Sequence, residues 1–278
     1  MARAQVSSTA TFGVEERPLL KPPLKWAGGK RWLIPHMHRL WLLSACGRLV
    51  EPFCGGLAVA LGLGPRRALL NDVNEHPVNF YRWLQRGLRI RILMRNDPEL
   101  FYQHRAEFNR LITTRGRHTR KAAELFYYLN RTAYNGLCRF NRRGEFNVPF
   151  GRYKTIRYVH DFTPYRRALT GWEFTEGDFA EMALHPDDFV YADPPYDVQF
   201  RQYSKGGFDW FEQERLAVWL SHHRGPVALS NQATPRIIGL YRKLGFELHH
   251  LDAPRAISCN GDRAPAREVL ALRNVSFE

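Results

Sequence analysis

The sequence has few cysteines, no long apolar run and fewer acidic than basic residues, and each shortage excludes a class of protein. Because the cysteines form no C-x-x-C pair, the sequence predicts neither a disulfide framework nor a zinc knuckle. No run of about 18 apolar residues occurs, so we expect no membrane span, and the N-terminus lacks the apolar core of a signal peptide. The four cysteines are far apart in the chain: Cys46, Cys54, Cys138 and Cys259.

Two common nucleotide-binding signatures and the usual metal motifs are also missing. The chain contains neither G-x-G-x-x-G nor G-x-x-x-x-G-K-[ST], which disfavours a dinucleotide or a triphosphate ligand. None of its 11 histidines lies in an H-E-x-x-H motif or at a Cys/His ligand spacing. We therefore predict no bound metal, and expect neither magnesium nor a chelator to change the activity.

The composition supports a folded, strongly basic protein. Hydrophobic residues make up 44% of the 278 and aromatic residues 13%, enough for a core in one large domain or two smaller ones. Lysine and arginine number 41 against 27 acidic residues, a net charge of +14. Such an excess costs self-repulsion and favours an anionic partner over the alternative of a merely basic soluble protein.

Short apolar runs alternate with helical patterns at both ends of the chain. This alternation predicts an α/β protein with a mostly parallel sheet and helices on its faces. The last two runs predict a closing antiparallel pair. The expected strands lie within residues 48–53, 68–71, 172–176, 188–192, 225–231, 246–253 and 267–274.

Residues 86–164 interrupt the alternation and carry most of the excess charge. They hold 17 lysines and arginines against 6 aspartates and glutamates, a net charge of +11. Helical patterns come first, and a hairpin signal follows at residues 137–148, where Gly144 suits the positive φ of a bulged turn. We interpret this segment as an inserted domain.

Two glycine-containing stretches predict a ligand site. In "EPFCGGL" (residues 51–57), Gly55 follows a strand and precedes a helix, and Asp72 ends the next strand 17 residues later. That spacing suits a carboxylate that accepts hydrogen bonds from ribose hydroxyls, whereas the structural alternative is a tight turn with a helix cap. In "LKWAGGKRWL" (residues 24–33), Trp26 can cover an aromatic ring or a sulfonium, and Lys30 opens a helix.

The stretch "DFVYADPPYD" (residues 188–197) predicts an amine-binding edge. A parallel strand delivers its last side chain, here Asp193, to the ligand crevice. Proline has no N–H, so the carboxylate and the Pro194 carbonyl form a rigid edge that only accepts hydrogen bonds. This edge suits an exocyclic amine, and Tyr196 adds a flat face on which a base can stack.

These motifs, in this order, resemble the Dam family, the DNA adenine-N6 methyltransferases of bacteria and phages. The resemblance runs from about Pro23 to Leu272 and is strongest over residues 129–153, which are similar to the family's DNA-recognition segment. It implies a Rossmann-like class I methyltransferase sheet of seven strands with an inserted helical and β-hairpin recognition domain. The implied organisation is a flexible tail (1–20), a catalytic domain (21–85 and 165–278) and a target-recognition domain (86–164).

The resemblance also implies ligands and residue roles. The cofactor would be S-adenosylmethionine, with S-adenosylhomocysteine as product, and the substrate a flipped adenine in double-stranded DNA at GATC. Asp193, Pro194, Pro195 and Tyr196 would be catalytic. The implied cofactor contacts are Trp26, Lys30, Phe53, Gly55, Asp72 and Asp193. The implied DNA contacts are Lys25, Tyr134, Asn135, Leu137, Arg139, Asn141, Arg142, Pro149, Tyr153 and Asn260.

The chain departs from the family pattern in three places. The loop "FCGGL" lacks the final glycine of F-x-G-x-G, "RTAYNG" has Thr132 and Ala133 where an aromatic residue and a glycine are common, and "NGDRAPARE" is less basic than its counterpart. Alternatives are a cytosine-N4 or RNA-adenine methyltransferase, a DNA-binding protein without activity, or one half of a restriction system. We expect a monomer or a weak dimer on DNA, located in the cytoplasm at the nucleoid, or in the host cytoplasm if a phage encodes it.

Overall fold

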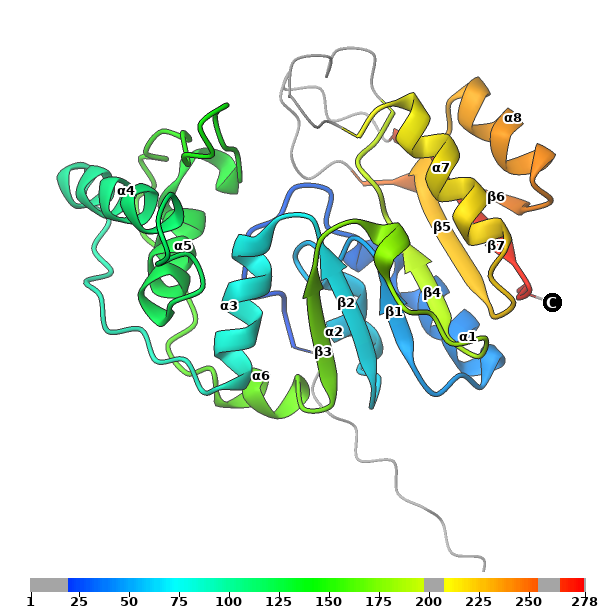
Figure 1. Cartoon of the computed structure of the whole chain (residues 1–278), viewed down its shortest axis with the longest axis horizontal. Coiled ribbons are helices and arrows are strands. Elements are labelled where there is room, and N and C mark those ends of the chain that lie inside the picture. Colours follow the sequence, from blue (N-terminus) through cyan, green and yellow to red (C-terminus); the bar gives the residue numbers. More distant parts are fainter. Residues whose placement is uncertain (1–19, 198–207, 255–265, 278) are drawn as a thin grey trace, which may run out of the picture.

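The protein is built on one seven-stranded sheet, as the sequence predicts. The computed structural model describes residues 20–197, 208–254 and 266–277. The strand order is β3-β2-β1-β4-β5-β7-β6, and only β7 runs antiparallel to its neighbours (Figure 1). The predicted antiparallel pair at the end of the chain is therefore confirmed. The strands are β1 (Leu49–Glu51), β2 (Ala68–Asp72), β3 (Trp172–Glu176), β4 (Phe189–Ala192), β5 (Val227–Gln232), β6 (Glu247–Ala253) and β7 (Ala266–Arg273).

Side-chain caps fix where several helices begin. The side chains of Asn74, Asp97, Thr119, Asp209 and Thr234 each accept a hydrogen bond from a main-chain N–H in the first turn of the helix that follows. Within the described ranges, no helix is long and apolar enough to cross a membrane. The helices are η1 (Arg31–Leu33), α1 (Ile34–Ser44), α2 (Ala58–Leu63), α3 (Glu75–Gln85), α4 (Pro98–Ile112), α5 (Arg120–Thr132), η2 (Tyr134–Gly136), α6 (Thr163–Ala168), η3 (Phe179–Glu181), α7 (Trp210–Ser221) and α8 (Pro235–Lys243).

Both faces of the sheet are buried, which explains the nearly continuous apolar strands. Successive strand residues point to opposite faces, so Leu49 belongs to one core and Val50 to the other. Helices α1, α2 and α3 contribute to the first core, and α7 and α8 to the second. Figure 1 shows α7 and α8 on one side of the sheet and α1 and α2 on the other.

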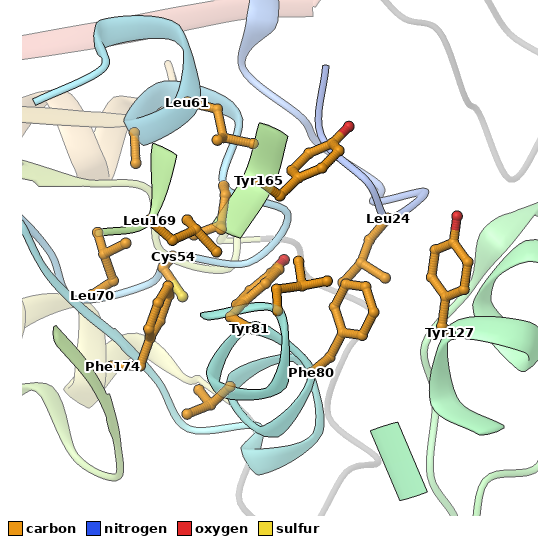
Figure 2. Packing of buried hydrophobic residues seen from close by; sticks show 14 of the residues in the cluster. Leu24, Cys54, Leu61, Leu70, Phe80, Tyr81, Tyr127, Tyr165, Leu169 and Phe174 are labelled. Atoms are coloured by element: carbon orange, nitrogen blue, oxygen red, sulfur yellow. The ribbon is translucent and has the colours of Figure 1, made fainter. Parts of the chain in front are cut away.

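Helix α3 joins the sheet to the basic segment. Phe80 of α3 stacks on Tyr127 of α5, with ring centroids 5.2 Å apart and planes 3° apart. One residue later, Tyr81 packs towards the sheet, with its ring centroid 5.4 Å from that of Phe174 in β3. Figure 2 shows these side chains between the sheet and α5. The first core is thus continuous from the strands into residues 98–165.

The predicted hairpin turn is confirmed, although its pairing is short. Phe140 and Phe146 form an isolated antiparallel bridge, and Gly144 has φ 77°. Helix α4 holds the second side of the hairpin, because Asn109 Oδ1 accepts from Phe146 N–H (2.8 Å) while its Nδ2 donates to Phe146 O (3.1 Å). The hairpin is therefore fixed through its main chain rather than through a long strand ladder.

We expect Phe80→Ala to destabilise the fold strongly, because the ring is fully buried between two helices. Large-to-small changes of a core phenylalanine cost about 3–5 kcal/mol. The free energy of unfolding in urea measures the loss. Leu43→Ala, at a side chain that is 54% exposed, is the control and should change that free energy by less than about 0.5 kcal/mol. An equal effect of the two changes would contradict the shared core at α3.

Candidate active site

The carboxyl ends of the central strands bring several polar side chains to one edge of the sheet. The strand order reverses between β1 and β4, and ligands of open α/β sheets bind at such a point. Glu51 ends β1 and Asp72 ends β2, whereas Asp193 directly follows β4. Ser230 approaches the same edge from β5. The structure therefore assembles the two predicted acidic residues with two polar residues that the sequence did not single out.

Asp193 is held at one carboxylate oxygen, and its side chain stays partly exposed. Lys30 Nζ lies 2.9 Å from Asp193 Oδ1, and Ser230 Oγ donates to the same oxygen at 2.9 Å. The Asp193 side chain keeps 21% of its surface exposed, so it is not sealed inside the protein. Both protein donors are thus directed to Oδ1, which leaves Oδ2 as the natural acceptor for a ligand.

Lys30 occupies the centre of a buried charge network. Its side chain is 3% exposed, and its Nζ lies 3.8 Å from Glu268 Oε2 and 4.7 Å from the centre of the Tyr196 ring. The Tyr196 hydroxyl donates to Glu268 Oε1. Burial raises the pKa of the Glu268 carboxyl, and the Lys30 ammonium opposes the rise. Burial also raises the pKa of Tyr196, so the hydroxyl stays a donor at neutral pH.

Asp72 fixes the glycine loop to the next strand. Its Oδ2 accepts from Gly55 N–H and its Oδ1 from Asn74 N–H, both at 2.9 Å. Burial raises the pKa of the Asp72 carboxyl to about 6, although the two amide donors oppose the shift. The next residue, Val73, is 79% exposed. A carboxylate with acceptor capacity left therefore lies beside an uncovered apolar side chain.

Trp26 packs directly on the glycine loop. A Cβ atom added to Gly55 would lie 2.6 Å from Trp26 Nε1, and one added to Gly56 would lie 2.7 Å from Trp26 Cβ. The two glycines therefore make room for the indole, a role that the sequence pattern alone assigned to a ligand. Tyr81 holds the loop from the other side through a hydrogen bond from its hydroxyl to Gly55 O (2.6 Å).

Glu51 and Phe53 complete the floor of the site. Glu51 is buried, and no described residue supplies a hydrogen bond to its Oε1. Burial raises the pKa of this carboxyl well above its usual value, and the nearby Asp193 carboxylate adds to the rise. The half-buried Phe53 ring contacts Phe179, with ring centroids 5.7 Å apart. A buried carboxyl group, whose Oε1 has no hydrogen-bond partner among the described residues, and an aromatic ring thus lie next to the glycine loop.

Lys25 connects this edge of the sheet to the predicted recognition segment. Its main-chain N–H donates to Asn130 Oδ1 and its carbonyl accepts from Asn130 Nδ2, both at 2.8 Å. Its ammonium donates to Arg131 O at 3.0 Å and lies 3.6 Å from the centre of the Tyr153 ring. Burial, followed by the charge of Arg131, lowers the pKa of Lys25 to about 8.

Two of the predicted DNA contacts, Tyr134 and Asn135, are exposed after the end of α5. Tyr134 is 51% exposed, and its main-chain N–H donates to Pro149 O at 2.9 Å. The exposed Asn135 has φ 51°, a left-handed conformation that asparagine tolerates well. The Tyr153 hydroxyl donates to Ala133 O at 3.1 Å. These contacts present Tyr134 and Asn135 outward from the end of α5.

The hairpin side chains divide into internal and outward groups. Arg139 is exposed, and its Nε donates to Asn147 Oδ1 at 2.9 Å across the hairpin. Arg142 and Pro149 are exposed and Leu137 is half-buried. Asn141 uses its side chain inside the turn, where Oδ1 accepts from the N–H groups of residues 143 and 145. Asn260, which the sequence also predicts to bind DNA, lies outside the described residues.

Three residues of the site carried weak signals in the sequence. Ser230 stands in the expected strand "GPVALSN", Glu268 is the one acid within "REVLALR", and Gln213 lies in an ordinary helical pattern. Of the three, only Glu268 gave a usable signal, because an acidic residue within an apolar run indicates a polar partner inside the protein. All three are buried at the reactive edge.

One group of possible metal ligands lies elsewhere on the surface. Ligand atoms of Glu75, His118 and Glu176 all lie within 4.8 Å of one another. Each glutamate already pairs with an arginine, Glu75 with Arg117 (3.5 Å) and Glu176 with Arg82 (3.1 Å). These cations compete with a metal, so the group reads as an ion-pair network that joins α3, β3 and the loop before α5.

Known proteins are similar in sequence to this chain. The model of the family "D12 class N6 adenine-specific DNA methyltransferase" matches residues 26–257. The DNA adenine methylase of Escherichia coli (strain K12) is 35% identical over 272 residues, which cover 90% of this chain and 94% of that protein. A "Type II methyltransferase M1.LlaDCHI" of Lactococcus lactis subsp. cremoris is 32% identical, with 89% and 92% covered.

A phage relative is longer. The DNA N-6-adenine-methyltransferase of Escherichia phage P1 is 37% identical over 267 residues, which cover 89% of this chain. Those residues span 35% of the phage protein, about a third of its length.

We expect Gly56→Ala to destabilise the protein through Trp26, because the added methyl group would lie 2.7 Å from Trp26 Cβ. Overpacking of this kind costs roughly 1–3 kcal/mol. Urea unfolding of Gly56→Ala, Trp26→Gly and the double variant measures the coupling, because glycine at position 26 removes the Cβ atom that the new methyl group would meet. The double variant should lose less free energy of unfolding than the sum of the two single variants. Strictly additive losses would contradict the contact.

Proposed function

The chain belongs to the D12 class of N6 adenine-specific DNA methyltransferases, and we propose that Asp193 and Pro194 bind the amino group of its target adenine within GATC. The observation that carries this proposal is the partly exposed Asp193, whose Oδ1 pairs with Lys30 and accepts a hydrogen bond from Ser230. Its Oδ2 can then accept one hydrogen of the amine, and the Pro194 carbonyl the other.

This arrangement answers the chemical difficulty of the reaction. The lone pair of the adenine amino nitrogen is delocalised into the ring, which makes the nitrogen a poor nucleophile. Two acceptors on its hydrogens favour a tetrahedral nitrogen and free the lone pair. Fixed acceptors also stabilise the positive charge that develops as the methyl group is transferred. Tyr196, held through its hydroxyl by Glu268, would supply the stacking face for the base.

The residues around the glycine loop fit S-adenosylmethionine as methyl donor. When bound, this cofactor supplies a sulfonium whose methyl group is electrophilic. Asp72 would accept hydrogen bonds from its ribose hydroxyls, and the exposed Val73 would be covered by its adenine. Glu51, whose Oε1 has no hydrogen-bond partner among the described residues, would face its polar end. By their motif positions, Trp26, Lys30, Phe53 and Gly55 would line the same site.

The GATC assignment is supported by the recognition segment. Arg139 would read a guanine with its two terminal nitrogens, because its Nε is already bonded to Asn147. Lys25 would reach the outer guanine, and Leu137 with Pro149 would contact the thymine methyl. Tyr134 and Asn135 would fill the gap left by the flipped adenine, which offsets part of the cost of flipping. We assign Asn141, Arg142, Tyr153 and Asn260 to the wider DNA interface.

We extend the proposal to the organisation of the chain. Residues 86–164 would form the target-recognition unit and residues 21–85 and 165–278 the catalytic unit, with residues 1–20 as a tail. We propose that the protein acts as a monomer or a weak dimer on double-stranded DNA and releases S-adenosylhomocysteine. A pairing with a restriction enzyme is the second candidate, favoured by the Type II methyltransferase among its relatives.

We expect Asp193→Asn to lower the single-turnover rate of methyl transfer by about 100-fold or more, because the amide replaces a charged acceptor at the amine. Transfer of a tritiated methyl group to a GATC duplex gives the rate, and fluorescence anisotropy gives a DNA affinity that should stay close to wild type. Asp187→Asn, at a side chain that is 84% exposed, is the matched control. A near-normal rate for Asp193→Asn would refute its role.

We expect Arg139→Ala to relax the choice of sequence. Loss of one bidentate contact should reduce discrimination at a single base pair by about 1–3 kcal/mol. Duplexes that each carry one change within GATC, methylated by the wild type and the variant, measure this discrimination. Arg142→Ala should instead weaken all duplexes alike, as a phosphate contact does. The assignment of Arg139 is wrong if its variant shows that same uniform loss.

A further inference from the structure

Gln213 of α7 holds the reactive loop from inside the protein. Its side chain is 1% exposed, and its Nε2 donates to the carbonyl of Pro195 at 2.8 Å. Pro195 is the third residue of the Asp193–Tyr196 loop, and its own carbonyl is the group that Gln213 turns towards the protein. None of the sequence motifs includes this glutamine.

A second amide fixes the orientation of the first. Asn231 Nδ2 donates to Gln213 Oε1 at 2.9 Å and to the Tyr241 hydroxyl at the same distance. Asn231 is fully buried. Because Gln213 Oε1 accepts from Asn231, the NH₂ group of Gln213 must face Pro195. The direction of the hydrogen bond to the loop is therefore set by the network.

Asn231 follows Ser230, which donates to Asp193 Oδ1. Adjacent strand residues point to opposite faces, so the end of β5 supports the loop twice. Ser230 reaches the carboxylate directly, and Asn231 acts through Gln213 on the Pro195 carbonyl two residues further on.

We propose that Gln213 is a positioning residue for methyl transfer, which sets the direction of the Pro194 carbonyl by fixing the carbonyl that follows it. In extended and polyproline conformations, successive carbonyl groups point in different directions. Holding the Pro195 carbonyl against α7 therefore turns the Pro194 carbonyl away from α7, towards the crevice. This inference rests on the proposed role of Asp193 and Pro194 as the acceptors of the adenine amine.

The first test removes the donor without adding charge. Gln213→Leu should lower the single-turnover rate by about 10- to 100-fold, because small misplacements of reacting groups have effects of this size. The affinity for a GATC duplex should change little. Gln85→Leu is the matched control, since Gln85 Nε2 donates to the carbonyls of Leu169 and Trp172 far from the reactive loop. Its rate per folded molecule should stay within about twofold of wild type.

The second test makes the donor depend on pH. In Gln213→Glu, a carboxylate facing the Pro195 carbonyl cannot donate, whereas the protonated acid can. Burial raises the pKa of such an acid, so the rate relative to wild type should rise as the pH falls through that raised pKa and be lost above it. A glutamine that only filled space would give no such recovery at low pH.

The outcomes separate this inference from the proposed function. If the wild type does not methylate adenine in a GATC duplex, the proposed target is wrong. If the wild type is active and both Gln213 variants keep its rate at every pH, the positioning role is wrong. If Gln213→Leu does not fold, the pH dependence of Gln213→Glu decides alone: recovery at low pH supports the role, and a rate ratio independent of pH overturns it.

Discussion

One buried ammonium group holds the reactive edge together. Lys30 neutralises Asp193, lies between that residue and Glu268, and covers the ring of Tyr196. Removing one member of such a buried group leaves the others uncompensated, at a cost of about 3–5 kcal/mol. The position of the Asp193–Tyr196 loop therefore depends on a residue that is more than 160 positions earlier in the chain. The fold builds this site because it brings Lys30 beside the end of β4 and beside β7.

The same short segment also carries the contact to the recognition side. Lys25 is fastened to α5 by two hydrogen bonds with Asn130, and Trp26 packs on the glycine loop. Residues 25–30 thus contact α5, the glycine loop and the Asp193 carboxylate in turn. The hydrophobic core is continuous across α3 and α5, so the sheet and the helical segment share one packed interior at this point. Under the proposed function, the residues that read the DNA and those that position the amine are joined by this packed core.

Much of the fold was predictable because strand and helix periodicity are local properties of the chain. The seven strands, the antiparallel end and the positive φ of Gly144 followed from alternation and turn chemistry. The polar support of the site did not, because Gln213 and Glu268 act through partners far away in the sequence. The glycines of the loop were interpreted as room for a ligand, yet the structure fills that room with Trp26. The position of a glycine in the sequence indicates that a side chain would not fit there, but it does not identify the neighbouring group that fills the space.

The attachment of the hairpin to α4 bears on how such enzymes can diversify. Asn109 binds both main-chain groups of Phe146, and every amino acid except proline has both groups. The outward residues of the hairpin can therefore be exchanged without loosening its anchor. If these outward residues contact DNA as proposed, natural drift or laboratory selection can change the recognised sequence while the rest of the structure stays the same.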